Sequence, residues 1–398
     1  MVAMADSPVS VPSAGELLRD VASYDLADHV VGLAEALVGN PAGLYVADIA
    51  GTELRRVAGS PALPAVLAIP SAIGPEMPRR QAEEIQTALR EIDRNLSVVP
   101  LWLRHRAIAV IVCVGHPPPA LDDLARESAA AMELIGGYTD QFASARRREQ
   151  VSPPAQLQQD LLPPRISAAR GVDIAASILP AYDVGGDWFD HSTSEFGAWM
   201  AVGDAMGKGL RAAALSALAV AAQRSVRQAG GGLIDAARTM HDAVLHGGED
   251  EAFMTTILAS WDARNLALSW INCGHPPPLL HRAGQPLEPL SSRVCVPLGL
   301  TDLSPTLELA HVVLQPGDQV LLYSDGVTER RRADGEFFGT HGVQAALAGP
   351  LGRRSAASTV TALQRAVMAA SDEDLRDDAT IMAIEVTAVR PSDDALRC

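Results

Sequence analysis

The stretch LLYSDGVTE, residues 321–329, places an acidic turn beside a short apolar run. The same combination recurs in the second half of this 398-residue chain, in GGDWFD (185–190), VGDAMGKG (202–209) and DDATIMAIEV (377–386). Short apolar runs bounded by such turns are typical of buried β-strands. We therefore expect Asp204, Asp325 and Asp377 to lie at strand ends, where side chains from distant segments can converge.

Converging carboxylates favour a metal site. The GGDWFD segment is a further acidic group that adjoins a strand-like run. Hard divalent cations such as Mg²⁺ or Mn²⁺ prefer a shell of oxygen ligands of this kind. The sequence therefore predicts a site for two divalent cations.

Together with INCGHPPPLL (271–280), these motifs resemble the type-2C metal-dependent protein phosphatases. The resemblance is strongest to their bacterial branch, typified by stage II sporulation protein E and the sigma-regulator phosphatases. It implies a catalytic domain over residues 166–388, folded as an αββα sandwich of two antiparallel sheets flanked by helices. It also implies the oxygens that hold two Mn²⁺ or Mg²⁺ ions: the side chains of Asp187, Asp204, Asp325 and Asp377 and the carbonyl of Ala205.

The implied activity is that of a protein-serine/threonine phosphatase. Two cations lower the pKa of a bridging water, and the resulting hydroxide attacks phosphorus while the metals neutralise the phosphoryl charge. By the same resemblance the substrate is a phosphorylated anti-anti-sigma factor, so the enzyme acts in sigma-factor regulation by partner switching. The alternative is a non-catalytic binding module that sequesters a phosphoprotein, although such a module has no need of the acidic quartet.

Secondary site candidates surround the predicted ligands. Asp190 and Asp378 adjoin them and are expected to orient metal-bound waters. Lys208 is expected either to contact the substrate phosphate or to be merely solvated. His275 is expected either to serve as a general acid or to belong to a tight structural turn at residues 274–278.

Met206 is the departure that raises the question of a general acid, because eukaryotic type-2C enzymes carry histidine at this place. Thr255 and Thr256 are minor site candidates in a segment otherwise expected to be core. GGDWF also resembles the GGDEF signature of diguanylate cyclases, but Trp188 replaces its acidic residue. GDAMGKG imitates a phosphate-binding loop, but Gly209 stands where that loop needs Ser or Thr.

The first part of the chain predicts a separate α+β domain. Its pattern is two helices or one kinked helix at 16–38, a hairpin at 42–58, a helix at 79–92, a hairpin at 96–114 and a long helix at 121–148. This order resembles a GAF-type sensor domain over residues 16–145. Residues 146–165, with AQLQQDLLPP inside them, are expected to form a helical linker that could carry a signal or a homodimer contact.

Composition and charge narrow the remaining choices. A net charge of −16 argues against a nucleic-acid partner, and no apolar run reaches the roughly 20 residues of a membrane helix. The four cysteines include no CxxC pair, and the N-terminus lacks the pattern of a secretory signal, so we expect a cytoplasmic protein. Flexible tails are expected at residues 1–15 and 389–398.

Overall fold

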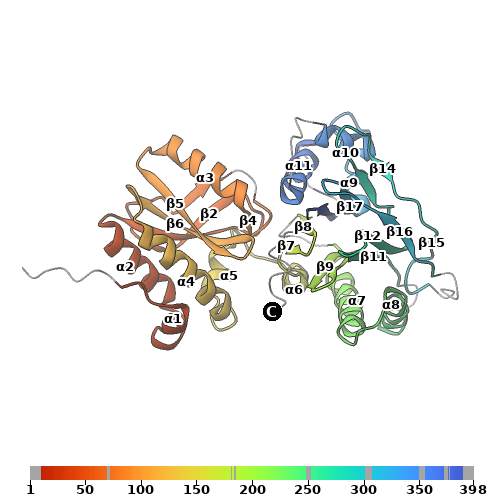
Figure 1. Cartoon of the computed structure of the whole chain (residues 1–398), viewed down its shortest axis with the longest axis horizontal. Helices are drawn as coiled ribbons and strands as arrows, with labels where there is room; N and C mark the ends of the chain where they lie inside the picture. The colour runs from red at the N-terminus through yellow and green to blue at the C-terminus, as the bar shows by residue number, and fades with distance from the viewer. Residues whose placement is uncertain are drawn as a thin grey trace, which may run out of the picture. The chain divides into compact units, whose positions relative to one another are not determined.

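The computed structural model divides into two compact units, residues 1–150 and 151–398 (Figure 1). It describes residues 10–69, 72–180, 182, 185–247, 252–300, 307–348, 355–371, 375 and 377–388. The expected tails therefore lie largely outside the described residues. Among the described helices, none combines the length and the hydropathy that a membrane span requires.

The N-terminal unit is built on one six-stranded sheet of order β3-β2-β1-β6-β4, with β5 also paired to β6. Its strands are β1 (Ala42–Ala47), β2 (Glu53–Gly59), β3 (Val66–Ala68), β4 (Met77–Pro78), β5 (Leu96–Leu103) and β6 (Arg106–Val114). Both predicted hairpins are confirmed, because β1 pairs with β2 and β5 pairs with β6, each antiparallel.

Helices cover both faces of this sheet (Figure 1). They are α1 (Ala14–Asp20), α2 (Leu26–Val38), α3 (Arg79–Ile92), α4 (Pro119–Ile135) and α5 (Gln141–Ala145). Side chains alternate along a strand, so Leu44 of β1 packs in the core with α1, α2, α4 and α5, whereas Tyr45 packs in a second core with α3. A mixed helix-and-sheet unit is thus confirmed, and its likeness to a GAF domain stays a prediction.

The long helix predicted at 121–148 is wrong in its extent. The structure ends α4 at Ile135 and resumes with the short α5 after a turn that contains Gly136 and Gly137. Two consecutive glycines are poor helix formers, which explains the break. The pattern at 16–38, for which one kinked helix was an alternative, forms two helices.

The C-terminal unit contains two six-stranded sheets. Sheet I has the order β15-β12-β11-β10-β9, with β16 paired to β12, and sheet II has the order β14-β13-β17-β18-β8-β7. Sheet I comprises β9 (Asp187–Ser194), β10 (Gly197–Ala205), β11 (Met254–Asp262), β12 (Ala267–Cys273), β15 (Val294–Cys295) and β16 (Ala310–Val313). Sheet II comprises β7 (Ile166–Ala169), β8 (Val172–Leu179), β13 (Leu279–His281), β14 (Glu288–Pro289), β17 (Gln319–Tyr323) and β18 (Ala379–Val386).

The two sheets pack face to face, and helices cover their outer faces, so the αββα sandwich is confirmed. Phe189, Trp270, Leu322 and Met382 belong to one buried core between the sheets. The helices α7 (Leu210–Gln228) and α8 (Leu233–Gly247) cover sheet I, and α11 (Ala356–Ala369), with α9 (Asp325–Thr328) and α10 (Gly339–Leu347), lies beside sheet II (Figure 1). One pair departs from the antiparallel expectation, because β15 runs parallel to β12.

The segment expected to be a linker is divided between the two units. Arg146 is partly buried in the N-terminal unit, where its guanidinium donates to the carbonyls of Pro75 and Ile108. Helix α6 (Pro153–Leu161) instead packs against α7 of the C-terminal unit. Its prolines begin the helix after the Ser152 cap, because proline in the first turn has no N–H that needs an acceptor.

Candidate metal centre

Asp187 and Asp204 lie side by side on two neighbouring strands of sheet I. They are paired in the β9–β10 ladder, and both strands are anchored by large side chains on the inner face. Asp187 is only 2% exposed, and its Oδ2 accepts hydrogen bonds from Ser324 Oγ and Thr380 Oγ1, each at 2.6 Å. Since Ser324 and Thr380 belong to sheet II and its flanking turn, Asp187 joins the two sheets at the site.

Two motif glycines are required by close backbone approaches. A Cβ on Gly186 would lie 2.2 Å from the carbonyl oxygen of Ala205, and a Cβ on Gly326 would lie 1.9 Å from that of Asp378. No side chain fits at such distances. The glycines of the GGD and SDG motifs therefore allow the acidic segments to approach one another at the ends of the two sheets.

Asp377 and Asp378 have different environments although they are adjacent. Asp378 is buried, and its carboxylate accepts hydrogen bonds from the Gly185 N–H at 2.9 Å and from Gln158 Nε2 at 3.0 Å. The Asp377 side chain is 60% exposed. The buried carboxylate thus organises the GGD turn, whereas the exposed one is available to a ligand.

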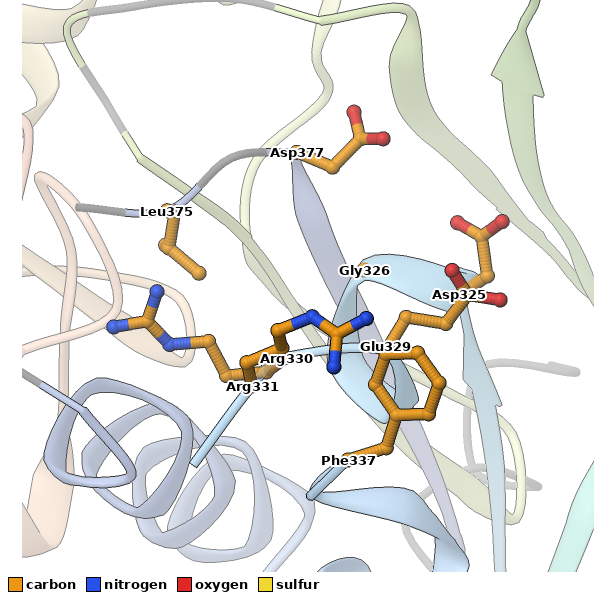
Figure 2. A pocket seen from close by; sticks show the side chains of 8 residues that line it. All are labelled: Asp325, Gly326, Glu329, Arg330, Arg331, Phe337, Leu375 and Asp377. Atoms are coloured by element: carbon orange, nitrogen blue, oxygen red, sulfur yellow. The ribbon is translucent and has the colours of Figure 1, made fainter. Parts of the chain in front are cut away.

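Asp325 and Asp377 line the same pocket, a cavity of about 220 Å³ (Figure 2). Asp325 begins α9 directly after β17, and Asp377 precedes β18, the neighbouring strand. The remaining lining residues are Gly326, Glu329, Arg330, Arg331, Phe337 and Leu375. As predicted, the acidic residues lie at strand ends, and the pocket opens beside them.

The electrostatics of the site reflect crowded carboxylates. Burial raises the pKa of Asp187 well above its ordinary value, and Asp204 and Asp378 raise it further. Burial, followed by Asp325, Asp377 and Asp378, raises the pKa of Asp204 to about 7. Burial likewise raises the pKa of Asp378 to about 6. Such a cluster favours either protons or cations, because several buried carboxylates close together disfavour one another's ionised form.

The donor set fits hard divalent ions. Asp187, Asp204, Asp325 and Asp377 offer carboxylate oxygens, the Ala205 carbonyl lies against Gly186, and oxygen ligands are those that Mg²⁺ and Mn²⁺ prefer. Across the described part of the chain, no three His, Cys, Asp or Glu side chains are close enough together to hold a metal ion as they stand. The structure thus brings the predicted ligands to one end of the sandwich without closing a complete shell.

The prediction that Asp190 orients metal-bound waters is wrong. It lies three residues after Asp187 on β9, so strand alternation turns it toward α7 and away from the carboxylate cluster. Its buried carboxylate accepts hydrogen bonds from Gln223, Arg224 and Arg227, with Arg224 Nη2 at 2.7 Å and Arg227 Nη1 at 2.9 Å. Asp190 therefore anchors α7 to sheet I and does not orient metal-bound waters.

His275 occupies a braced turn. Its N–H donates to Asn272 Oδ1 and its carbonyl accepts from Asn272 Nδ2, both at 2.8 Å. Its ring Nδ1 is 2.8 Å from Oγ1 of Thr255, the residue paired with Asp204 in the β10–β11 ladder. Burial lowers the pKa of His275 to about 4. This environment supports the structural turn over a protonated acid at neutral pH.

The other minor candidates differ in whether they lie in the core or at the surface of the site. Thr256 is fully buried and donates to the Val202 carbonyl at 2.8 Å, so it is a core residue. Lys208 Nζ lies 3.6 Å from Asp377 Oδ1, with both side chains more than half exposed. Met206, two residues before Lys208 in the chain, is 50% exposed. Lys208 is thus placed at the exposed side of the site.

Three functional residues were missed from the sequence. Ser324 and Thr380 stand inside the SDG and DDAT motifs, so their hydroxyls could have been noticed as partners for a carboxylate. Gln158 gave no such signal, because it contacts Asp187 and Asp378 from a helix far away in the sequence. Only the three-dimensional packing of α6 shows it.

Comparisons with known proteins find phosphatases that are similar to the C-terminal unit. Residues 194–387 match the family model of stage II sporulation protein E. Phosphoserine phosphatase RsbU of Bacillus subtilis is 24% identical over 189 residues, which is 47% of this chain and 56% of that protein. The chain thus spans about half the length of this curated relative.

Solved structures include two similar chains. The SiaA-PP2C domain of Pseudomonas aeruginosa matches 65% of this chain and 99% of its own, with a TM-score of 0.50 and 22% identity. The RsbU and RsbW domains of a Mycobacterium tuberculosis protein match 56% of this chain and 62% of theirs, with a TM-score of 0.46 and 26% identity. The first of these likenesses supports the fold of the C-terminal unit.

Proposed function

We propose that the C-terminal unit contains a phosphatase domain of the stage II sporulation protein E type, and that this chain hydrolyses phosphoserine or phosphothreonine on a protein. The observation that carries the proposal is the position of Asp187 opposite Asp204, at the end of the sandwich where Asp325 and Asp377 line a pocket. Crowded carboxylates in this arrangement suit two Mn²⁺ or Mg²⁺ ions.

The metals, when bound, would supply an activated water and neutralise phosphoryl charge. The side chains and backbone of the protein hold the predicted metal-binding carboxylates in position. Ser324 and Thr380 fix one oxygen of Asp187, and the Gly185 N–H and Gln158 fix Asp378. Asp325 and Asp377 lie at the pocket, where a phosphorylated side chain can enter. Lys208, whose Nζ lies 3.6 Å from Asp377 Oδ1, would offer positive charge to the phosphoryl group.

The substrate class follows from kinship. RsbU is named as a phosphoserine phosphatase, and the motifs resemble those of sigma-regulator phosphatases. We therefore propose a phosphorylated anti-anti-sigma factor as substrate, with partner switching as the regulatory outcome.

Control by the N-terminal unit is part of the proposal. Helix α6 begins three residues after the boundary between the units, and its Gln158 contacts two predicted site residues. A displacement of α6 would therefore break or shift the hydrogen bonds that Gln158 makes to Asp187 and Asp378. A GAF-like sensor role and a homodimer through residues 146–165 would provide such a displacement.

The test compares hydrolysis of p-nitrophenyl phosphate and of a phosphoserine peptide with Mn²⁺ and with EDTA. We expect Mn²⁺-dependent turnover that Asp204→Asn and Asp325→Asn reduce by at least about 100-fold. Asp242→Asn, on the exposed side of α8, is the matched control and should behave like the parent. Equal turnover of all proteins in Mn²⁺ and in EDTA would leave the alternative, a non-catalytic phosphoprotein-binding module.

A further inference from the structure

Two cysteines lie side by side on the outer face of sheet I. Cys273 ends β12 and Cys295 ends β15, and the two residues are paired in the parallel ladder between these strands. Neither is in a disulfide, and both belong to the core between sheet I and its helices. Neither takes part in the proposed phosphatase site.

The strand geometry suits a covalent link. Neighbouring strands are about 4.8 Å apart, and paired residues direct their side chains to the same face of a sheet. A disulfide accepts Cα separations of about 4.4–6.8 Å. The pair can therefore be joined without moving either strand far from its present place.

The environments of the two thiols differ in a way that favours reaction. A hydrogen bond from Cys273, assisted by the Glu308 backbone and by Arg293, lowers the pKa of the Cys295 thiol to about 6. The same hydrogen bond and burial raise the pKa of Cys273. At neutral pH one partner is then a thiolate nucleophile and the other is a thiol that can resolve its oxidised form.

Access is provided by the short strand β15. Its pairing with β12 involves only Val294 and Cys295, and it ends the strand order of sheet I. Val294 and Val296, on either side of Cys295, are 59% and 42% exposed. Few backbone contacts thus hold Cys295 in the ladder, so local opening toward a small oxidant costs little.

We propose that Cys273 and Cys295 form a redox modification site that closes to an intramolecular disulfide with hydrogen peroxide. The Cys295 thiolate attacks one peroxide oxygen, the O–O bond breaks, and the hydroxide released takes up a proton to leave as water. The sulfur of Cys273 then displaces the hydroxyl of the resulting sulfenic acid, losing its own proton, so a second water leaves. A dithiol reductant reverses the reaction by thiol–disulfide exchange.

The modification would sit next to the braced turn of the proposed active site. Cys273 is followed by Gly274, which forms a bridge with Thr256 of β11, and then by His275, which contacts Thr255. A disulfide would fix the end of β12 to β15 immediately before this turn. Formation of this disulfide does not depend on phosphatase activity.

The experiment uses the full chain with Cys398→Ser, which leaves Cys113 as an internal control. Reduced protein is treated with hydrogen peroxide, its thiols are counted, and its peptides are mapped by mass spectrometry without reduction. We expect loss of two of the three thiols, a link between the peptides of Cys273 and Cys295 within one chain, and full recovery with dithiothreitol. Cys113 should keep its thiol.

Variants separate this pair from general oxidation. Cys273→Ala and Cys295→Ala should each abolish the link, and Cys113→Ala should leave it intact, with folding of every variant checked by circular dichroism. The proposal is overturned if the folded parent keeps all thiols, if Cys113 reacts as fast as the pair, or if only links between chains or irreversible sulfinic forms appear.

Discussion

The side-chain amide of Gln158 donates a hydrogen bond of 3.0 Å to the carboxylate of Asp378, a residue 220 positions later in the chain. The same nitrogen donates to the backbone carbonyl of Asp187 at 2.8 Å. Gln158 is 3% exposed, so these contacts are shielded from water. Helix α6, which follows the boundary between the two units, is therefore an integral part of the candidate metal centre.

Replacement of Gln158 by Ala should weaken metal-dependent activity while the fold remains. The amide orients groups beside the predicted ligands, and loss of such outer contacts typically costs about 10–100-fold in metal affinity or activity. The measurement is the Mn²⁺ concentration that gives half-maximal hydrolysis. Gln156→Ala, which removes a bond to Asp160 on the exposed side of the same helix, should leave that concentration unchanged. If both variants required the same Mn²⁺ concentration, a role of Gln158 in orienting the metal ligands would be contradicted.

Replacement of Asp190 by Asn should reduce stability and spare the chemistry. The change leaves Arg224 and Arg227 without their buried carboxylate, and removal of one partner from a buried ion pair costs about 3 kcal/mol or more. Urea unfolding should show the loss, and turnover per folded molecule in saturating Mn²⁺ should stay near that of the parent. If the variant were as stable as the parent but needed more Mn²⁺ for activity, Asp190 would instead belong to the metal site.

Local patterns were enough to predict several of the strands and helices of this chain. The hairpins of the N-terminal unit and the strand β17 before the SDG motif follow from short apolar runs and turn residues, which act over a few positions. The helix at 121–148 was overextended because its apolar spacing continues through Gly136 and Gly137, where backbone preference decides.

The site was predictable in part. Asp187 and Asp204 lie together as expected because each belongs to a motif at a strand end. Asp190 was misassigned because nearness in sequence was used where the face of the strand decides. The contact of Gln158 depends on how α6 packs against α7, and no periodicity within residues 153–161 contains that information.

The stability of the metal-free protein should fall as pH rises from 5 to 8. The pKa of Asp204 is raised to about 7, so in this range the folded protein holds a proton there that the unfolded chain releases. Melting temperatures in EDTA should therefore decrease with pH, and Asp204→Asn should flatten the decrease by keeping the site neutral. The difference between the two proteins should be largest at pH 8.

Mn²⁺ should act in the opposite sense, because metal binding requires the ionised carboxylates. It should raise the melting temperature of the parent more at pH 8 than at pH 5.5, and it should raise that of Asp204→Asn less at both. An Mn²⁺ effect that is the same at both pH values would mean that Asp204 is not a ligand.

His275 should prove to be a positioning residue and not the missing general acid. Burial lowers its pKa to about 4, so its ring is neutral from pH 5.5 to 8.5, and its Nδ1 is engaged with Thr255 beside Asp204. His275→Ala should reduce kcat/KM by about 10-fold, less than the 100-fold or more expected for a general acid. His275→Asn, whose amide can reach the same hydroxyl, should restore much of the loss. The pH dependence of kcat/KM should keep its shape in both variants, and disappearance of its alkaline limb in Ala and Asn alike would make His275 the proton donor to the leaving serine oxygen.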